Sequence, residues 1–598
     1  MKKRGVKVDY YARKALRPED EILVGAIDVE TDGFNGELLM VQWGIAGEIH
    51  TASGSDMLDK LFDFVLQWTK PAVWYSHFAQ YDWRYLIPWL IEKGYVLDLG
   101  MRTDNDVYEV RITNTDGETV ILRDSFALWN SKLEALADTF CPEIPKLKID
   151  IEQFDPENPE HIAYARRDVQ ILMVGLPRLF DMLSEHFGVN AGATTAGTAL
   201  KAWQKSLQKD EIYDCSEWGP KEAFIRQAYY GGIVFLTNNV AQTDCITCDI
   251  NSSYPAVMDE CGVPWGRVVE TVDWQSGLPG IYRVRVRAPD GLIVPILPAR
   301  NNRGAMRWYS GEFETVVTNI ELLFAAQHGY EILEIYEGVC FEKTIYPFSD
   351  LISHCKMLRM VYKDMPVEML AKLIQNSLYG KFGARRDRVR VMHAKTMEDE
   401  DYIGAQPLDD DGEFYIRKEF DEEMRCLPQW SVFITANARL KLLKAAYAVG
   451  PENVIYGDTD SITLKKGNEH LIDIGPNYGQ FKIEKEWETF RAVGPKQYSG
   501  KLGADILKAD GSVKVAKGSY LGAAKGLAKK AMKEINWKEL LEDGATKATT
   551  ITIDSLRVCL KKGIRPARTV TRNSSDISNS SNYDALPDGN VRVKSAVN

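Results

Sequence analysis

Two aspartates separated by one residue lie in a segment whose pattern predicts a β-hairpin. The apolar residues 454–455 and 462–464 flank the polar turn that contains Asp458 and Asp460. Two short apolar arms around a tight polar turn are typical of a hairpin. Carboxylates this close repel each other unless a cation lies between them, and Mg²⁺ prefers carboxylate, water and phosphate oxygens. The hairpin therefore predicts a metal site for a phosphate-bearing substrate, whereas the same motif standing alone would be interpreted as a solvated acidic turn.

A third acidic residue ends another predicted strand. Asp249 follows the strand-like run 245–248 and precedes a tight turn that Pro255 stops. An isolated aspartate at a strand end is usually structural. If Asp249 faces Asp458 and Asp460, the three carboxylates complete a metal site of the kind used in two-metal phosphoryl chemistry.

Four more acids occur in the first third of the chain. Asp28 and Glu30 are two apart in a predicted strand, so their side chains face the same way. Asp82 follows a second strand, and Asp168 lies one helical turn after Tyr164. These acids are the ligand set that a two-metal phosphodiesterase needs, and the Tyr164 phenol is placed to orient a water. The sequence predicts a second, hydrolytic metal site.

A predicted helix over residues 367–379 presents three polar or aromatic side chains on one face. Lys372, Asn376 and Tyr379 are spaced at i, i+4 and i+7. A lysine ammonium is a compact cation suited to a triphosphate, and a tyrosine ring stacks on a base. This face is expected to receive a nucleotide.

Hydrophobic patterns predict the elements that position these residues. Strands over 21–26 and 72–75 lead into the first acids, and a helix that begins at Pro159 carries Asp168. Residues 261–354 are expected to be mixed α/β, with a strand over 280–287 and a helix over 314–328.

Length and composition limit the class of protein. A chain of 598 residues is expected to form several domains. Its 45% hydrophobic and 26% charged residues are typical of globular protein. We find no apolar run long enough to cross a membrane and no apolar leader segment, so neither membrane insertion nor secretion is expected. Nine scattered cysteines favour free thiols in a reducing cytoplasm.

The pair Cys245 and Cys248 has the spacing of half a zinc site. A structural zinc site needs a second pair of ligands, and none follows at a suitable spacing. In a strand, an offset of three also places the two side chains on opposite faces. A zinc site is therefore not expected here.

The net charge of −12 argues at first against a nucleic-acid partner. Basic residues nevertheless cluster over 381–390, 517–533 and 561–572, and the segment 391–429 is acidic and predicts an inserted, solvated hairpin. Net acidity therefore does not exclude a positive groove around the predicted sites.

The ordered set of motifs resembles the family B DNA polymerases, and more closely their protein-primed branch in small linear-genome phages and linear plasmids. Matches to the polymerase motifs are Asp249–Pro255, Lys372–Gly380, Tyr456–Ser461, Thr435–Arg439, Lys496–Tyr498 and Tyr229–Gly232. Matches to the three proofreading motifs are Asp28–Glu30, the segment around Asp82, and Tyr164–Asp168.

The resemblance implies an α/β multidomain fold: a ribonuclease-H-like 3′–5′ exonuclease domain followed by a right-hand polymerase of palm, fingers and thumb with two insertions. The expected boundaries are 1–189 for the exonuclease domain, 190–260 for the first part of the palm, 261–354 for the first insertion, 355–390 for the fingers, 391–429 for the second insertion, 430–535 for the second part of the palm, and 536–598 for the thumb and C-terminal tail. The first insertion is expected to contact a priming protein and DNA, and the second to give processivity and strand displacement.

The resemblance also implies roles for individual residues. Metal ions are expected at Asp249, Ile250, Asp458 and Asp460 in the polymerase site and at Asp28, Glu30, Asp82 and Asp168 in the exonuclease site. The nucleotide is expected to contact Tyr254, Lys372, Asn376 and Tyr379. Either Arg359 or Lys363 is expected to add a second cation, and Lys363 is the one included in the predicted nucleotide site. Catalytic roles in excision fall to Tyr164 and a lysine, for which Lys146 is favoured over Lys148. DNA is expected to contact Thr31, Phe78, Tyr81, Ser125, Tyr229, Gly231, Gly232, Ser252, Arg439, Lys496 and Tyr498.

The chain departs from the family pattern at a few positions. Ser253 replaces a leucine, and Phe78 and Tyr81 stand where the second exonuclease motif usually has asparagine and phenylalanine. Ser125 is followed by Phe126 where the family usually has leucine. Metal binding by Asp82 is expected to survive, whereas the grip on a single-stranded primer is expected to differ.

The expected cofactor is Mg²⁺, two ions in each site, with Mn²⁺ as an alternative. The expected partners are template-primer DNA, dNTPs and a terminal protein that serves as primer, and a monomer in the cytoplasm of a host cell is expected. Three alternatives stay open: a nuclease with a vestigial polymerase half, a non-catalytic nucleic-acid scaffold, and a family B polymerase that starts from a nucleic-acid primer or from none.

Overall fold

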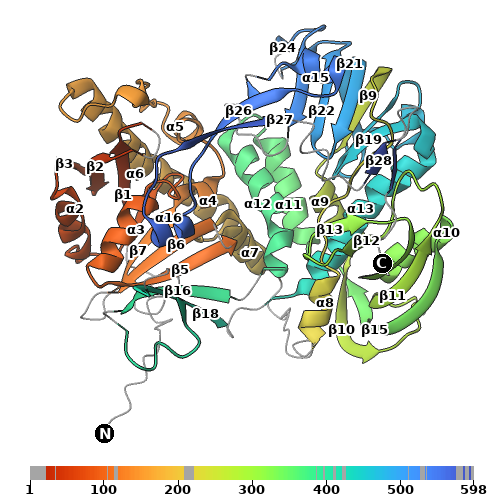
Figure 1. The fold of residues 1–598 in the computed structure, drawn as a ribbon, viewed down its shortest axis with the longest axis horizontal. Helices are drawn as coiled ribbons and strands as arrows, with labels where there is room; N and C mark the ends of the chain where they lie inside the picture. Colours follow the sequence, from red (N-terminus) through yellow and green to blue (C-terminus); the bar gives the residue numbers. More distant parts are fainter. Residues whose placement is uncertain are drawn as a thin grey trace.

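A large mixed sheet forms the N-terminal part of the molecule (Figure 1). The computed structural model describes residues 22–33, 36–103, 106–113, 119–207, 221–275, 277–384, 387–394, 397–407, 412–420, 426–508, 511–524, 532–533, 535–573, 583–585 and 591–593. The strands from this part of the chain are β1 (Leu23–Thr31), β2 (Leu38–Ile45), β3 (Glu48–Ser53), β4 (Ala72–Ser76), β5 (Val96–Thr103), β6 (Asp106–Thr113) and β7 (Thr119–Asp124). Its helices are α2 (Met57–Leu66), α3 (Trp83–Glu92), α4 (Ser125–Trp129), α5 (Leu133–Phe140) and α6 (Pro159–Phe187).

The long helix α6 begins where the sequence predicts and ends at Phe187. The Asn158 side chain caps the first turn, Pro159 occupies the first helical position, and Gly188 ends the helix with φ 64°. Leu172, Leu176 and other apolar residues on one face are buried. This face packs against β1 and β2, and it therefore brings the helix acid Asp168 to the strand that carries Asp28 and Glu30.

A hairpin from much later in the chain extends the N-terminal sheet. The strands are β16 (Asp387–His393), β17 (Gln406–Pro407) and β18 (Phe414–Phe420). β16 pairs with β5, and the sheet order is β17-β18-β16-β5-β6-β7-β4-β1-β2-β3. Arg390 on β16 donates to Asp98 on β5 at 2.8 Å. The predicted inserted hairpin forms in its described residues, but it begins at Asp387 and not at residue 391. It is also not simply solvated, because β16 joins this sheet and Val391 is buried.

A second sheet carries the three later aspartates. Its order is β25-β22-β21-β9-β20-β19-β8. The strands are β8 (Val234–Leu236), β9 (Gln242–Ile250), β19 (Val454–Asp458), β20 (Ser461–Lys465), β21 (Phe481–Gly494), β22 (Gln497–Leu502) and β25 (Tyr520–Ala524). The neighbouring helices are α8 (Glu222–Gln227), α9 (Ser253–Glu260) and α13 (Pro428–Val449), and a small pair, β23 (Ile506–Leu507) and β24 (Val513–Val515), extends the loop before β25.

Residues after α9 fold into a sheet of their own with the order β10-β15-β11-β14. Its strands are β10 (Val263–Glu270), β11 (Gly280–Ala288), β14 (Gly311–Thr318) and β15 (Glu331–Ile345), joined by the pair β12 (Pro298–Arg300) and β13 (Met306–Trp308) and by α10 (Asn319–Gln327). The expected strand over 280–287 is confirmed. The helix expected over 314–328 is wrong at its start, because residues up to Thr318 alternate in β14 and Thr318 with Glu321 forms a capping box that starts α10.

Three helices lie between the two large sheets (Figure 1). They are α7 (Thr195–Ser206), α11 (Ser349–Val361) and α12 (Pro366–Phe382). One aromatic cluster joins α7 and α12 to α13, and it consists of Trp203, Phe348, Phe382 and Trp430. The helix predicted over 367–379 is confirmed as α12, with Pro366 at its first position.

The C-terminal part crosses back to the N-terminal sheet (Figure 1). Its elements are α15 (Trp537–Asp543), β26 (Lys547–Thr552), α16 (Leu556–Lys562), β27 (Arg568–Asn573), β28 (Tyr583–Ala585) and β29 (Val591–Val593). α16 packs on α3, and Leu556 and Leu560 are buried in the N-terminal core. Parts of the basic clusters over 381–390 and 517–533 fall outside the described residues. No helix in the described ranges has the length and apolarity needed to cross a bilayer.

Candidate active sites

The two hairpin aspartates lie beside Asp249 on adjacent strands of one sheet. β19 ends at Asp458, and Asp460 completes the two-residue turn before β20. Ser461 pairs directly with Asp249 on β9. The amide of Ile250 donates to the Asp460 carbonyl at 2.7 Å. The predicted hairpin is confirmed, and these strand ends gather the three carboxylates.

Lysine side chains balance two of these carboxylates. The Lys496 ammonium lies 2.9 Å from Oδ1 of Asp458, and the Lys482 ammonium lies 3.3 Å from Oδ2 of Asp249. Burial, followed by repulsion from Asp249 and Asp458, raises the pKa of Asp460 to about 6. A cluster that resists full ionisation in this way is suited to bind a cation.

The helix face predicted to receive a nucleotide lies next to this cluster. Lys372 and Asn376 are exposed on α12, and Lys363 is exposed just beyond the end of α11. Tyr379 stacks on Tyr254 with ring centroids 4.2 Å apart and an interplanar angle of 5°. Since Tyr254 belongs to the first turn of α9, this ring pair joins α12 to α9, the helix that follows the strand carrying Asp249.

Lys496 and Tyr498 approach the hairpin from the turn between β21 and β22. Lys496 adopts φ 58°, and its amide donates to the Tyr456 hydroxyl at 2.9 Å. The Tyr498 ring lies 5.5 Å from the ring of Tyr456. Lys496 therefore lies at the carboxylates, whereas the Tyr498 ring packs against the ring of Tyr456.

The glycines of the Tyr229–Gly232 segment lie against the hairpin turn. A Cβ on Gly232 would meet the Thr459 side chain at 2.8 Å, and the Thr459 amide donates to Ile233 at 2.8 Å. Gly231 is exposed, and a Cβ there would meet open space. Of the two positions, only 232 must be glycine, because the Thr459 side chain leaves no room there for a Cβ. This contact holds the segment next to Asp458 and Asp460.

In the N-terminal sheet, a single amide bridges the first two acids. Nε2 of Gln42 donates to Asp28 at 2.7 Å and to Glu30 at 3.2 Å, which confirms that both side chains face the same way. Burial and then repulsion from Asp168 raise the pKa of Asp28 to about 7. Burial and then the Asp28 charge also raise the pKa of Glu30.

Lys146 occupies the centre of this acidic group. Its ammonium donates to Asp168 and lies 3.4 Å from the Tyr164 hydroxyl. Lys148 instead pairs with Glu134 at 3.0 Å on the surface. The structure therefore brings Lys146, and not Lys148, to the carboxylates.

Two buried oxygens in this group have no hydrogen-bond partner within the described residues: Oδ2 of Asp82 and Oδ1 of Asp168. Burial, followed by the charge of Asp28, raises the pKa of Asp82. Within the described ranges, no three acidic, histidine or cysteine side chains converge as a finished ligand set. Lys146 forms an ion pair with Asp168 in this arrangement.

Phe78 lies at the open side of the N-terminal site. It is 56% exposed and adopts φ 61°, which is unusual for a bulky residue. Its ring meets Phe126 edge-on at 4.9 Å. Thr31 is buried, and its hydroxyl bonds to the Tyr81 hydroxyl at 2.6 Å. Among these three predicted DNA contacts, Phe78 is the residue with an exposed ring.

The predicted DNA contact of Ser125 is wrong. The side chain is fully buried, and its hydroxyl bonds to the Ser76 carbonyl at 3.1 Å and to Nδ1 of His77 at 2.9 Å. Ser125 therefore positions the segment that precedes Asp82. His77, which precedes Phe78 in the chain and was not among the predicted site residues, shares this contact.

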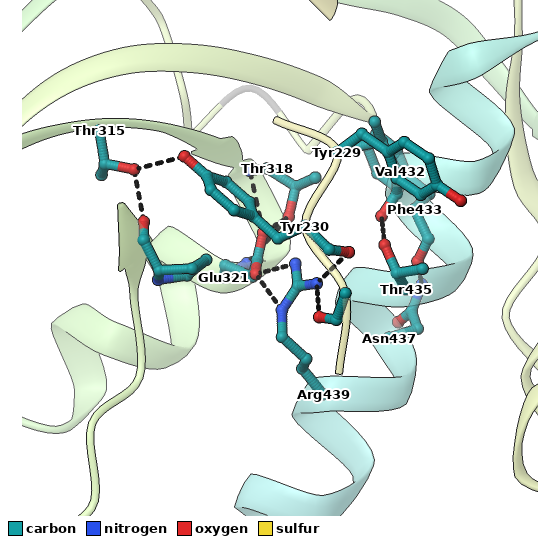
Figure 2. Close-up of polar contacts among 12 residues, drawn as sticks. Tyr229, Tyr230, Thr315, Thr318, Glu321, Val432, Phe433, Thr435, Asn437 and Arg439 are labelled. Carbon is teal, nitrogen blue, oxygen red and sulfur yellow. Dashed lines mark hydrogen bonds and ion pairs between the residues drawn. The ribbon is translucent and has the colours of Figure 1, made fainter. Parts of the chain in front are cut away.

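The predicted DNA contact of Arg439 is also wrong, because the side chain is 1% exposed. Figure 2 shows its guanidinium between Glu321 and the Tyr230 segment. It contacts Glu321 Oε1 at 2.6 Å and donates to the carbonyls of Tyr230 and Gly231 at 3.0 and 2.9 Å. Arg439 thus holds the tyrosine–glycine segment from behind, and no motif pointed to Glu321.

Comparison with known proteins places this geometry in a class. The structure of Phi29 DNA polymerase complexed with primer-template DNA aligns with a TM-score of 0.70 at 19% identity, covering 92% of this chain and 100% of that one. The shared fold joins an N-terminal domain of the exonuclease type to palm, fingers and thumb. The molecule therefore has the fold of Phi29 DNA polymerase.

Sequence comparison gives the family. A family model described as DNA polymerase type B, organellar and viral, matches residues 157–473, more than half of the chain. The chain belongs to this family.

Individual relatives are distant. The DNA polymerase of Bacillus phage phi29 is 26% identical over 372 residues, covering 58% of this chain and 60% of its own length. A probable DNA polymerase of Neurospora intermedia is 28% identical over 304 residues, covering 46% of this chain. The match spans only 31% of the Neurospora protein.

Proposed function

We propose that this protein is a DNA-directed DNA polymerase with a separate 3′–5′ proofreading exonuclease site. The observation that carries the proposal is the approach of Asp249, Asp458 and Asp460 on neighbouring strands, beside the stacked rings of Tyr254 and Tyr379. Membership in the type B family supports the same activity.

The donor sets of both sites fit divalent cations, for which we propose Mg²⁺. In the exonuclease site, buried unpartnered oxygens of Asp82 and Asp168 supply acceptors that a hard cation prefers. Asp28 and Glu30 would complete that set, and Asp249, Asp458 and Asp460, with Ile250 adjoining, would hold ions in the polymerase site. When bound, such ions activate the attacking oxygen and stabilise the leaving group in phosphoryl transfer.

The other residues would bind and orient the substrates. Lys372, with Arg359 or Lys363, would neutralise triphosphate charge, and Asn376 extends the same exposed face. Tyr254 would lie beneath the sugar and exclude a 2′-hydroxyl, so that dNTPs are the substrates. Tyr379 would pack on the nascent base pair.

Primer contacts would come from the palm. Lys496 would hold the primer end near Asp458, supported by Tyr498 and by the Tyr229–Gly232 segment. Template-primer DNA is thus the proposed partner, and its phosphate contacts would make binding salt-dependent.

Excision would take place on a single strand. A mispaired primer end frays readily because less pairing energy is lost, and it would reach Asp28, Glu30, Asp82 and Asp168. Tyr164 and Lys146 would orient the attacking water there. Tyr81 and Phe78 lie at this site to receive the terminal nucleotides.

Protein priming and strand displacement are the finer part of the proposal. We propose that the sheet β10-β15-β11-β14 contacts a terminal protein and that the β16–β18 hairpin assists displacement of the non-template DNA strand. The protein would act as a monomer in a host cytoplasm and replicate a linear genome. A covalent protein–dNMP product formed with a candidate terminal protein would support priming. Absence of that product while a nucleic-acid primer is still extended would favour the alternative, a polymerase that starts from a nucleic-acid primer or from none.

The two sites give the principal test. Asp458→Ala should abolish dNTP incorporation while single-strand degradation continues, and Asp28→Ala with Glu30→Ala should do the reverse. Primer extension and degradation are measured on the same folded preparations, with Asp505→Ala as a distant surface control. Loss of both activities in either variant would refute the two-site assignment.

A further inference from the structure

A loop outside all the sequence motifs is fastened to the turn after Asp249. Residues 475–480, between β20 and β21, make four backbone or amide hydrogen bonds with Asn251. The Gly479 amide donates to the Asn251 carbonyl at 2.8 Å, and the Asn251 amide donates to Gln480 at 2.9 Å. The Asn251 side chain donates to Gly475 at 2.9 Å and to Asn477 at 3.3 Å. The loop therefore holds the turn that links Asp249 to Tyr254.

The turn needs such support because of Ser252. This residue adopts φ 48° and ψ 54°, a left-handed conformation that a side-chain-bearing residue adopts only where its surroundings impose it. Its hydroxyl accepts a hydrogen bond from Nη1 of Arg359 at 2.9 Å. The strained turn is thus tied on one side to the loop and on the other to helix α11.

Tyr478, at the centre of the loop, joins these two attachments. Its hydroxyl accepts from the same Nη1 of Arg359 at 2.7 Å and donates to Oε1 of Gln375 at 3.1 Å. Its ring lies 4.9 Å from the Lys356 ammonium and 5.5 Å from the Arg359 guanidinium. A single phenol therefore contacts two helices that the chain places far from it.

Gln375 gives this contact its connection to the nucleotide face. It is fully buried on α12, three residues after Lys372 and one before Asn376. Its Nε2 has no hydrogen-bond partner within the described residues, and its Oε1 accepts a hydrogen bond from the Tyr478 hydroxyl. The Tyr478 hydroxyl thus links α12 to the Arg359 guanidinium.

We infer that Tyr478 is a positioning residue for the incoming dNTP, acting through Arg359 and the Asn251–Ser252 turn. This inference rests on the proposed polymerase function. The Arg359 side chain is 22% exposed; Tyr478 and Ser252 accept hydrogen bonds from its guanidinium, and the Glu368 carboxylate lies 3.9 Å from its Nε. A guanidinium held before the substrate arrives loses less entropy on binding.

The test removes one oxygen. Tyr478→Phe keeps the ring against Lys356 and Arg359 but loses both hydroxyl hydrogen bonds. The KM for dNTP in primer extension should rise about tenfold, as expected for a lost hydrogen bond to a charged group, while kcat changes less than about twofold. Degradation of single-stranded DNA, measured on the same preparation, should be unchanged.

A matched control and a double-mutant cycle separate positioning from general damage. Tyr447→Phe also removes a half-buried hydroxyl, one that donates to the Val294 carbonyl at 2.7 Å, and should leave the KM for dNTP at the wild-type value. Arg359→Lys should raise the KM by itself. Adding Tyr478→Phe to it should have little further effect, because the guanidinium that Tyr478 positions is already absent and loss of the Gln375 hydrogen bond alone is not expected to change the KM.

Each outcome decides the inference. A wild-type KM in Tyr478→Phe, a fall in kcat alone, or full additivity with Arg359→Lys would overturn it while leaving the polymerase proposal intact. Absence of dNTP incorporation by the wild-type protein would overturn the polymerase proposal and this inference with it.

Discussion

The guanidinium of Arg439 and the carboxylate of Glu321 form an ion pair in which each side chain is 1% exposed. The two residues are 118 positions apart and join α13 to the first turn of α10. Glu321 also accepts from the Thr318 hydroxyl at 2.7 Å, and Arg439 donates to two carbonyls of the Tyr229–Gly232 segment. The pair therefore couples the sheet of residues 263–345 to the neighbourhood of the hairpin aspartates.

Removing one partner of this pair should be costly. Glu321→Gln leaves the Arg439 charge buried without its counterion, and we expect the free energy of unfolding to fall by about 3–5 kcal/mol in urea titrations. Glu334→Gln, which breaks an exposed contact with Arg285, is the control and should have no measurable effect. Equal stability of the two variants would contradict the assigned role of the pair.

Phe78 should affect excision and stability in opposite directions. Phe78→Gly relieves a left-handed backbone that costs a bulky residue about 1–3 kcal/mol, so the free energy of unfolding should rise. The same change removes an exposed ring, and a stacked base contributes about 1–3 kcal/mol, so the KM for single-stranded DNA should rise about tenfold.

Phe78→Tyr keeps the ring and is the control for both measurements. We expect its exonuclease KM and its stability to match those of the wild type. A Phe78→Gly enzyme that degrades single strands with an unchanged KM would rule out the stacking role.

His77 should make stability sensitive to acid. Burial and then the Lys146 charge lower its pKa from about 6.5 to about 4. Between these values the unfolded chain binds a proton that the folded protein does not, so stability is lost as the pH falls from 6.5 toward 4. From pH 7 to pH 5 the wild type should lose about 1–2 kcal/mol more than His77→Gln. Parallel pH profiles for wild type, His77→Gln and the surface control His470→Gln would refute this.

Stabilisation by Mg²⁺ should also weaken as the pH falls. The raised pKa values of Asp28, about 7, and Asp460, about 6, mean that protons compete with the cation below neutrality. The rise in Tm on adding Mg²⁺ should be larger at pH 8 than at pH 5.5, and at a 100-fold excess over Kd it corresponds to about 2.7 kcal/mol. Asp28→Asn with Asp460→Asn should reduce the rise at pH 8, and an equal rise at both pH values would count against carboxylate binding.

Local periodicity was enough to predict how neighbouring acids are presented. The two-residue repeat of a strand placed Asp28 and Glu30 on one face, and the apolar arms of the hairpin placed Asp458 and Asp460 at its turn. The helical repeat likewise placed Lys372 and Asn376 together on α12. In each case the deciding interactions lie within a few residues of one another.

Features set by distant contacts were not predictable in this way. The burial of Arg439 depends on Glu321, and the burial of Ser125 depends on Ser76 and His77. Motif matching treats such residues as contacts of the ligand because it contains no information on depth. Tyr478 was missed for a related reason, since its partners come from α11, α12 and the turn after β9.

The attachment of β16 to β5 has a consequence for synthesis on the ribosome. Asp98 and its partner Arg390 are 292 residues apart, so at about 5–20 residues per second β5 waits roughly 15–60 s for its neighbour. During that interval the nascent sheet carries an open edge, which in general invites pairing with other chains. Asp98 places a charge on this edge until Arg390 arrives, and such a charge disfavours premature pairing. The N-terminal sheet, although its strands are the first to be translated, is therefore completed only after the sheet β10-β15-β11-β14.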